Sequence, residues 1–263
     1  MRLQAQGLPT GLVGLVQGAG VEVGVALVRH PLIAAGAFTG STRGGAALQA
    51  EANARPRPIP FYGELGSINP LIALPAALAA KGAELATTLA GSITLGCGQF
   101  CTNPGLLVLV DGPESDAFTE QLTLALSKQQ PHPMLTAGMK TAFDAGIRHF
   151  LDAGALSLLQ GQGVAPAPGP QLLQVSAQRF IERAELREEV FGPSSLIVRC
   201  ADLAQVQTVL AAVAGSLTVT IWGADDDTEQ NRALVRAATA IAGRVLFAGV
   251  PTGVAVTAAQ QHG

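Results

Sequence analysis

The sequence of 263 residues has few charged and few aromatic side chains. Charged residues make up 13% of it and aromatic residues 4%, with a single tryptophan and a single tyrosine. Disordered chains are rich in charge and poor in apolar residues, whereas 48% of this chain is hydrophobic, so a folded core is expected. The formal net charge is −3 and the basic residues do not cluster, which argues against nucleic acid or a charged membrane surface as a partner.

Cysteine is scarce, and long apolar runs are missing. The three cysteines, Cys97, Cys101 and Cys200, are too few and odd in number for a disulfide scaffold, which favours a reducing, cytoplasmic location. Mean hydropathy is +0.36, yet the longest apolar runs, such as Leu71 to Ala80, are shorter than the roughly 20 residues that a spanning helix needs. The first residues also lack the apolar core of a signal peptide, so no membrane association is expected.

Apolar strand-like runs alternate with segments of helical period along most of the chain. Strands are predicted at 12–16, 34–39, 59–65, 70–74, 106–110, 172–175, 195–198, 216–222 and 244–247. Helices are predicted at 21–29, 41–53, 76–95, 115–127, 136–153, 203–214 and 228–240. The Gly- and Pro-rich stretch 161–170 is predicted to be a loop. This alternation predicts an α/β fold with a mainly parallel sheet flanked by helices.

Two glycine-containing turns between a predicted strand and a predicted helix are candidate anion sites. The segment from Gly18 to Gly24 has one residue too many for a dinucleotide fingerprint, and in a chain with 31 glycines it is better explained as an ordinary turn. Gly40 and Ser41 would let backbone N–H groups and a hydroxyl approach an anion at a helix N-terminus, although Ser41 can equally serve as an N-cap.

One acid and one thiol are candidates for catalysis. Glu64 lies in an apolar strand between glycines, where an acid is either paired, functional or at a solvated edge. Cys101 follows a long predicted helix in a segment punctuated by Gly, Asn and Pro, where a thiol would be exposed, whereas most buried cysteines are inert packing residues. Cys97 and Cys101 have the spacing of a metal pair, but no further ligands lie nearby, so no metal is predicted.

Five ordered motifs together resemble those of the aldehyde dehydrogenase superfamily. They are Phe38-Thr39-Gly40-Ser41, Glu64-Leu65-Gly66, Gly98-Gln99-Phe100-Cys101, Glu189-Val190-Phe191-Gly192-Pro193, and Gly243-Arg244 with Pro251-Thr252-Gly253. The segments 64–70 and 99–105 are most similar to the branch that oxidises 2-ketoglutarate semialdehyde (2,5-dioxovalerate). The resemblance spans nearly the whole chain, and each motif alone is weak.

The resemblance implies a fold and a set of roles. Cys101 would be the nucleophile that attacks the aldehyde, and Glu64 the general base for water that hydrolyses the thioester. A nicotinamide cofactor, NAD or NADP, would be held by five residues, with Glu189 on its ribose and Phe191 against its ring; the other three are Gly40, Ser41 and Leu65. Residues 1–64 would form a partial cofactor-binding domain, 65–247 the catalytic domain, and 248–263 a segment that returns toward the cofactor domain.

The chain departs from the resembled family in two ways. Members are about twice as long, and their Asn-Phe-Pro segment is missing here, so we interpret the chain as a truncated form of a parent enzyme that forms homo-oligomers. Ala248 stands where relatives commonly have Asn. The alternatives are a non-catalytic remnant, or a thiol esterase that needs no cofactor, and the truncated chain is expected to oxidise aldehydes little. The sequence does not identify the aldehyde or the choice between NAD and NADP.

Overall fold

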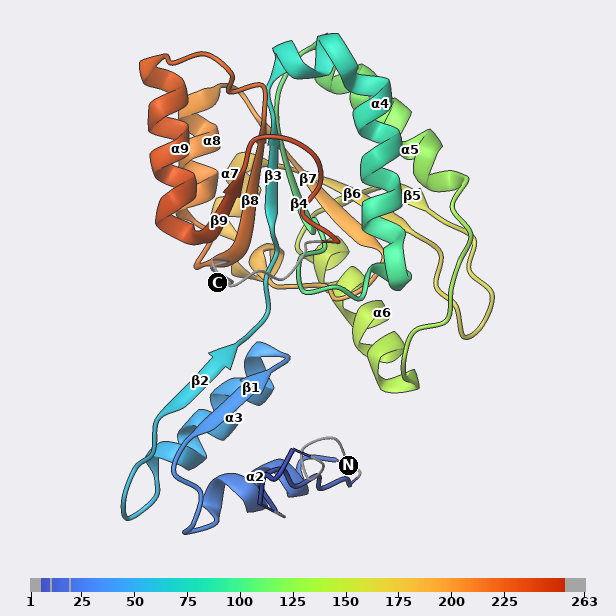
Figure 1. Cartoon of the computed structure of the whole chain (residues 1–263). Coiled ribbons are helices and arrows are strands. Elements are labelled where there is room, and N and C mark those ends of the chain that lie inside the picture. The colour runs from blue at the N-terminus through green and yellow to red at the C-terminus, as the bar shows by residue number, and fades with distance from the viewer. Residues whose placement is uncertain (1–5, 10, 19, 254–263) are drawn as a thin grey trace. The chain divides into compact units, whose positions relative to one another are not determined.

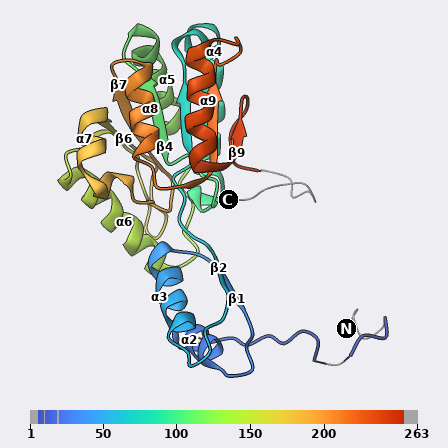
Figure 2. The same ribbon diagram turned by 90° about the vertical axis from the view of Figure 1, so that its left-hand side faces the viewer.

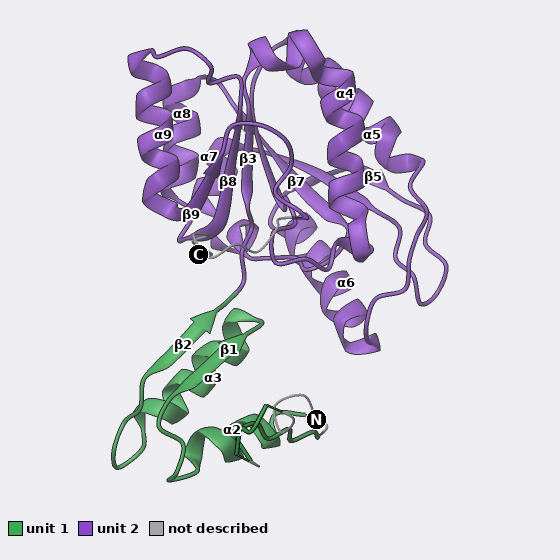
Figure 3. Cartoon of the chain, viewed as in Figure 1, with its two compact units in different colours: residues 1–65 green, residues 66–263 purple. Residues whose placement is uncertain are grey.

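The computed structural model describes residues 6–9, 11–18 and 20–253, and it divides into two compact units. Unit 1 comprises residues 1–65 and unit 2 comprises residues 66–263 (Figure 3). Within the described ranges, no helix combines the length and the hydropathy needed to cross a membrane. The assignment of a cofactor-binding and a catalytic function to the parts of the chain remains a prediction.

Unit 1 contains a small parallel sheet and helices (Figure 1). Its elements in chain order are α2 (Glu22–Arg29), β1 (Gly36–Thr39), α3 (Thr42–Asn53) and β2 (Phe61–Glu64). The two strands run parallel, with Gly36 opposite Phe61 and Thr39 opposite Glu64. An ion pair of 2.6 Å between Arg29 Nε and Glu51 Oε2 joins α2 to α3.

The strand predicted at residues 12–16 is wrong. Residues 11–18 adopt no helix or strand, and the side chains of Val13 and Leu15 are 73% and 82% exposed. A strand is stable only when its backbone groups pair with a neighbour, and no strand in the described part of the chain pairs with this segment. The apolar pattern alone therefore does not produce a strand here.

Unit 2 is built on a seven-stranded sheet with the order β5-β6-β7-β4-β3-β8-β9. All neighbouring strands are parallel except β5 and β6, which are antiparallel at one edge. The strands are β3 (Pro70–Ala73), β4 (Leu106–Val110), β5 (Leu156–Gln160), β6 (Gln171–Ser176), β7 (Ser194–Cys200), β8 (Ser216–Trp222) and β9 (Ala242–Leu246). The predicted α/β class with a mainly parallel sheet is confirmed.

Helices cover both faces of this sheet (Figures 1 and 2). One face carries α7 (Ala177–Glu182), α8 (Leu203–Ala211) and α9 (Glu229–Ile241), and α8 and α9 lie side by side. The other face carries α4 (Pro75–Thr94) and α5 (Pro113–Ser127). The remaining elements are α6 (Ala137–Asp152) and the short 3-10 helices η1 (Leu95–Gly98) and η2 (Ala184–Arg187).

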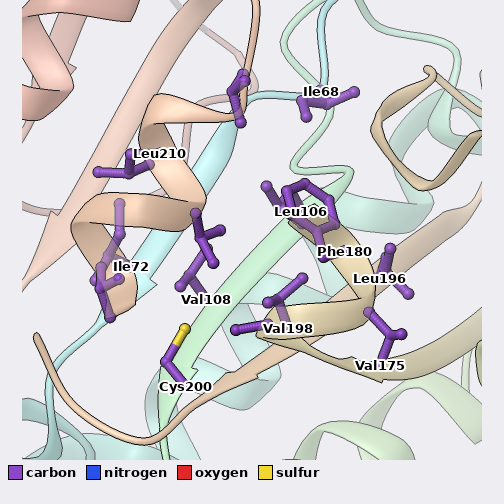
Figure 4. Close-up of a cluster of buried hydrophobic side chains, with 14 of the residues drawn as sticks. Ile68, Ile72, Leu106, Val108, Val175, Phe180, Leu196, Val198, Cys200 and Leu210 are labelled. Atoms are coloured by element: carbon purple, nitrogen blue, oxygen red, sulfur yellow. The ribbon is translucent and has the colours of Figure 1, made fainter. Parts of the chain in front are cut away.

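The core divides into two layers because successive strand residues point to opposite faces. From β4, Leu106 and Val108 join the layer under α7, α8 and α9, which Figure 4 shows together with Ile72, Phe180 and Leu210. Leu107 and Leu109 of the same strand join the layer under α4 and α5. The central strands β3 and β4 are thus buried on both faces of the sheet.

Residues after Phe247 pack against unit 2 as far as the structure describes them. Trp222 Nε1 donates to Gly249 O at 2.8 Å, and the hydroxyls of Ser92 and Thr252 lie 2.6 Å apart. Residues 254–263 lie outside the described residues, so the predicted return of 248–263 toward the cofactor domain remains a prediction.

Candidate active site

The candidate residues of unit 2 gather at the edge of the sheet where the strands begin. Three segments directly precede a strand: residues 67–69 precede β3, residues 101–105 precede β4, and residues 189–193 precede β7. Ser216 is the first residue of β8. These four strands are parallel and adjacent, so the segments that enter them meet at one edge. Each segment is anchored by the strand that follows it.

Cys101 is the exposed thiol of the chain, as predicted. It follows η1, where Gly96, Cys97 and Gly98 have φ of 56°, 60° and 64°, and this left-handed turn ends the long helix α4. Cys97 is buried, and its Sγ donates to His132 O at 3.1 Å. Burial raises the pKa of the Cys97 thiol, and burial with the nearby Asp111 and Asp202 raises the pKa of Cys200 to about 12.

The loop that carries Cys101 is held from beneath by Asn69, a residue that sequence reasoning missed. Asn69 is fully buried, and its Nδ2 donates to Cys101 O at 2.9 Å and to Asn103 O at 2.8 Å. A second missed residue, Asn103, donates from Nδ2 to Gly192 O at 3.2 Å and so ties the same loop to the segment before β7. The available signal was that each Asn directly precedes a Pro at a turn into a strand.

Gly98 brings the thiol loop and the segment before β7 into direct backbone contact. A Cβ on Gly98 would lie 2.2 Å from Gly192 O and 2.5 Å from Pro193 N. Ser195 Oγ donates to Pro104 O, and Leu196 N donates to Gly105 O at 2.9 Å. The two segments are therefore held together at the edge of the sheet where β4 and β7 begin.

Glu189 lies in the segment before β7, beside the thiol loop. Its Oε1 accepts from Ser67 N at 3.3 Å, and burial raises the pKa of the Glu189 carboxyl against the smaller opposing effect of that bond. Through Ser67 and Asn69, hydrogen bonds connect Glu189 to the carbonyl group of Cys101. Phe191 is half-buried two residues further on.

A small cavity of about 20 Å³ adjoins Glu189 and Asn103. Asn103 Oδ1 is buried and has no hydrogen-bond partner among the described residues. A cavity of this size admits one water molecule, which needs polar neighbours of this kind. The other lining residues include Ser67, Leu106, Phe150 and Ser194.

The predicted residues of unit 1 also come together, at the end of its small sheet. Gly40 N donates to Glu64 O at 3.0 Å, and Ser41 Oγ accepts from Gly44 N at 3.2 Å as the N-cap of α3. The Leu65 side chain lies over α3, where a Cβ on Gly45 would be 2.1 Å from Leu65 Cδ2. Glu64 is half-buried and belongs to unit 1, whereas Cys101 belongs to unit 2.

The structure thus groups Gly40, Ser41, Glu64 and Leu65 in unit 1, and Cys101, Glu189 and Phe191 in unit 2. Unit 1 presents the N-terminus of a twelve-residue helix with small residues at its start, a setting that suits an anion. Unit 2 presents an exposed thiol and a half-buried carboxylate. Across the described ranges, no three His, Cys, Asp or Glu side chains are grouped so as to hold a metal ion.

Comparison with known proteins identifies relatives of the whole chain. The aldehyde dehydrogenase family matches residues 2–257. The chain is 45% identical to alpha-ketoglutaric semialdehyde dehydrogenase 2 of Azospirillum brasilense and 39% identical to alpha-ketoglutaric semialdehyde dehydrogenase of Acinetobacter baylyi, in each case over 98% of this chain and 50% or 49% of the relative. It therefore spans about half the length of these relatives.

A solved structure resembles the chain over a similar extent. The NAD-dependent aldehyde dehydrogenase from Sinorhizobium meliloti superposes with a TM-score of 0.77 at 25% identity, over 96% of this chain and 50% of that one.

Proposed function

The chain belongs to the aldehyde dehydrogenase family, and on that premise we propose that it carries the thiol site for NAD(P)-dependent oxidation of an aldehyde to a carboxylate. The substrate we propose is 2-ketoglutarate semialdehyde or a related semialdehyde, which is supported by the names of the two relatives. The observation that carries the proposal is Cys101, an exposed thiol on a loop whose carbonyl groups are fixed by a buried side chain.

A covalent mechanism needs an accessible thiol, and the exposure of Cys101 supports that role. In its thiolate form, Cys101 Sγ would form a bond to the aldehyde carbon and hold the substrate first as a thiohemiacetal and then as a thioester. An ordinary thiol with a pKa near 8.5 is only about 3% ionised at pH 7, so the reaction needs a base or a site that stabilises the thiolate. Glu64 is the residue we propose as the base, both for the thiol and for the water that releases the acid.

The residues in place fit a nicotinamide dinucleotide. Gly40 and Ser41 lead into the N-terminus of α3, the helix end whose partial positive charge would attract a pyrophosphate, and Leu65 packs against the same helix. Glu189 offers carboxylate oxygens that can accept from ribose hydroxyls, and Phe191 offers an aromatic face. When bound, NAD(P)⁺ supplies the acceptor for the hydride that an aldehyde must lose to reach the oxidation level of an acid.

The proposal is tested by following NAD(P)H formation from 2-ketoglutarate semialdehyde with protein purified from its source cells. The rate of this chain, which spans about half the length of its relatives, is expected to be low, and we expect Cys101→Ala to abolish it because Cys101 is the group proposed to form the thioester. Cys200→Ala, which removes a buried cysteine from the core, is the matched control and should retain most activity. Ester hydrolysis that needs Cys101 but no NAD(P), without any NAD(P)H formation, would instead favour a thiol esterase.

A further inference from the structure

Asn69 connects the thiol loop to the sheet through its side-chain amide. Its side chain is fully buried, and Nδ2 reaches the carbonyl oxygens of Cys101 and Asn103, with a longer contact of 3.4 Å to Ser67 O. We propose that Asn69 is a positioning residue, which fixes the backbone of Cys101 and thereby the direction of the reactive thiol. The inference rests on the proposed function of Cys101 as the nucleophile.

The direction of every bond around Asn69 follows from donor and acceptor chemistry. An amide oxygen only accepts, so the Ser67 hydroxyl must donate its single proton to Asn69 Oδ1, which lies 2.8 Å from Ser67 Oγ. The contact of 2.8 Å between Ser67 Oγ and Ser216 Oγ is therefore donated by Ser216. Thr218 Oγ1 donates to the same Oδ1 at 3.1 Å.

The two carbonyl groups of the thiol loop decide which end of the Asn69 amide faces that loop. Cys101 O and Asn103 O can only accept, so the amide group must turn its two N–H donors toward them and its Oδ1 toward the Ser67 and Thr218 hydroxyls, which can donate. Both lone-pair positions and both protons of the side chain are then used.

The Asn69 backbone is held as firmly as its side chain. Its φ is 44°, in the left-handed region that Asn tolerates better than most residues. Its N–H donates to Ser216 Oγ at 2.8 Å, and Pro70 begins β3 directly after it. The side-chain amide that contacts the thiol loop is therefore held in place by the central sheet.

Fixing one carbonyl group determines the geometry at Cys101 because the neighbouring peptide is also fixed. Phe100 O accepts from Asn103 N at 3.0 Å, which holds the peptide plane before Cys101. Cys101 O accepts from Asn69 Nδ2, which holds the peptide plane after it. Since peptide groups are planar, two fixed planes set both backbone torsions of Cys101 and the direction of its Cα–Cβ bond. The exposed side chain of Cys101 therefore leaves the backbone in a fixed direction.

Alkylation of Cys101 tests the inference without any cofactor. The rate constant for iodoacetamide at Cys101 is measured by mass mapping across a pH series in wild type, Asn69→Gly and Ser115→Ala. Glycine keeps the left-handed backbone and removes only the side chain. Ser115→Ala removes a buried hydrogen bond of 2.6 Å to Val110 O, at the opposite end of β4, and controls for a general loss of stability.

We expect Asn69→Gly to raise the midpoint of the Cys101 profile and to lower the rate at pH 7 by about tenfold, because the released loop no longer holds the thiol and the neighbouring backbone amides in one arrangement. Ser115→Ala should lower the melting temperature but leave the Cys101 profile unchanged. If Asn69→Gly does not fold, Thr218→Val removes one of the two hydroxyl donors and should give an intermediate shift.

The inference is overturned if Asn69→Gly melts at a lower temperature than wild type but has the same midpoint and rate at Cys101. Slower alkylation in Asn69→Gly, in a protein whose Cys101 hydrolyses esters without NAD(P), would leave Asn69 as a positioning residue and reject the dehydrogenase instead.

Discussion

The three cysteines differ in burial, and this predicts an order of reactivity. Cys101 is exposed, whereas Cys97 and Cys200 are buried with raised pKa values. With a pKa of about 12, Cys200 is only about 0.01% thiolate at pH 8. Brief treatment with iodoacetamide followed by peptide mass mapping should therefore label Cys101 first. Equal labelling of the three cysteines would show that the thiol loop is not formed.

Glu189 predicts a dependence of stability on pH. Burial raises the pKa of this carboxyl in the folded state above its unfolded value of about 4.3, so ionisation disfavours folding. Its contribution is most favourable below the unfolded pKa and is lost as the pH rises through the folded pKa. Glu189→Gln should therefore melt at a higher temperature than wild type at pH 7, and the difference should shrink as the pH approaches 4.

The control for this prediction is Glu188→Gln, which removes the charge of the exposed neighbour. Differential scanning calorimetry of both variants between pH 4 and pH 7 provides the comparison, over a range set by the unfolded pKa of about 4.3. A lower melting temperature for Glu189→Gln at pH 7 would mean that the carboxylate is stabilised where it lies.

Among the connecting elements, the turn at Gly98 combines a left-handed backbone with close packing against a facing backbone segment. Its φ is 64°, and an added Cβ would be 2.2 Å from a backbone oxygen of the facing segment, which has no flexible side chain to move aside. Gly98→Ala should reduce the free energy of unfolding by about 2–4 kcal/mol. Urea unfolding measures this value.

Gly91 provides the matched control in the preceding helix. It lies inside α4, and nothing lies within 4 Å of an added Cβ. Gly91→Ala should stabilise the protein by about 0.5–1 kcal/mol, because alanine is the better helix former. A similar loss of stability in both variants would contradict the steric account of Gly98.

Most elements of unit 2 could be predicted because local pattern and tertiary packing agree. The predicted strands at 106–110 and 216–222 match β4 and β8, whose apolar runs are buried. Strand β5 was missed because it is an edge strand with mostly exposed residues, and α7 because six residues give little periodicity. Residues 12–16 show the reverse case, an apolar pattern without a neighbour to pair with.

The site was only partly predictable, for a related reason. Cys101 stands out in the sequence because the glycines and prolines around it indicate an exposed turn. The role of Asn69 depends on partners 32 and 149 positions away, Cys101 and Thr218, which no local pattern relates to it. The functional roles of Glu64 and the cofactor residues remain predictions.

At the scale of the whole molecule, the two units differ in how much they bury. The buried residues among those described in unit 1 are Val28, Gly45 and Ala52, whereas β3 and β4 of unit 2 are almost entirely buried. A two-stranded sheet with so little buried surface is marginal. We expect amide hydrogens of β1 and β2 to exchange on the order of a hundredfold faster than those of β3 and β4.

Hydrogen exchange followed by mass spectrometry measures this difference. Comparable protection of β1 and β4 would contradict the prediction.

The ring formed by Asn69, Ser216 and Ser67 has one further consequence. A backbone N–H begins it and an amide oxygen ends it, so each hydroxyl between them can point its proton only one way. The protons of the ring therefore have a single arrangement. Reversing one hydrogen bond would place two protons, or two lone pairs, between the same pair of atoms. None of its members is an acid or a base in the range where proteins function, so the same proton arrangement supports the thiol in acid and in alkali.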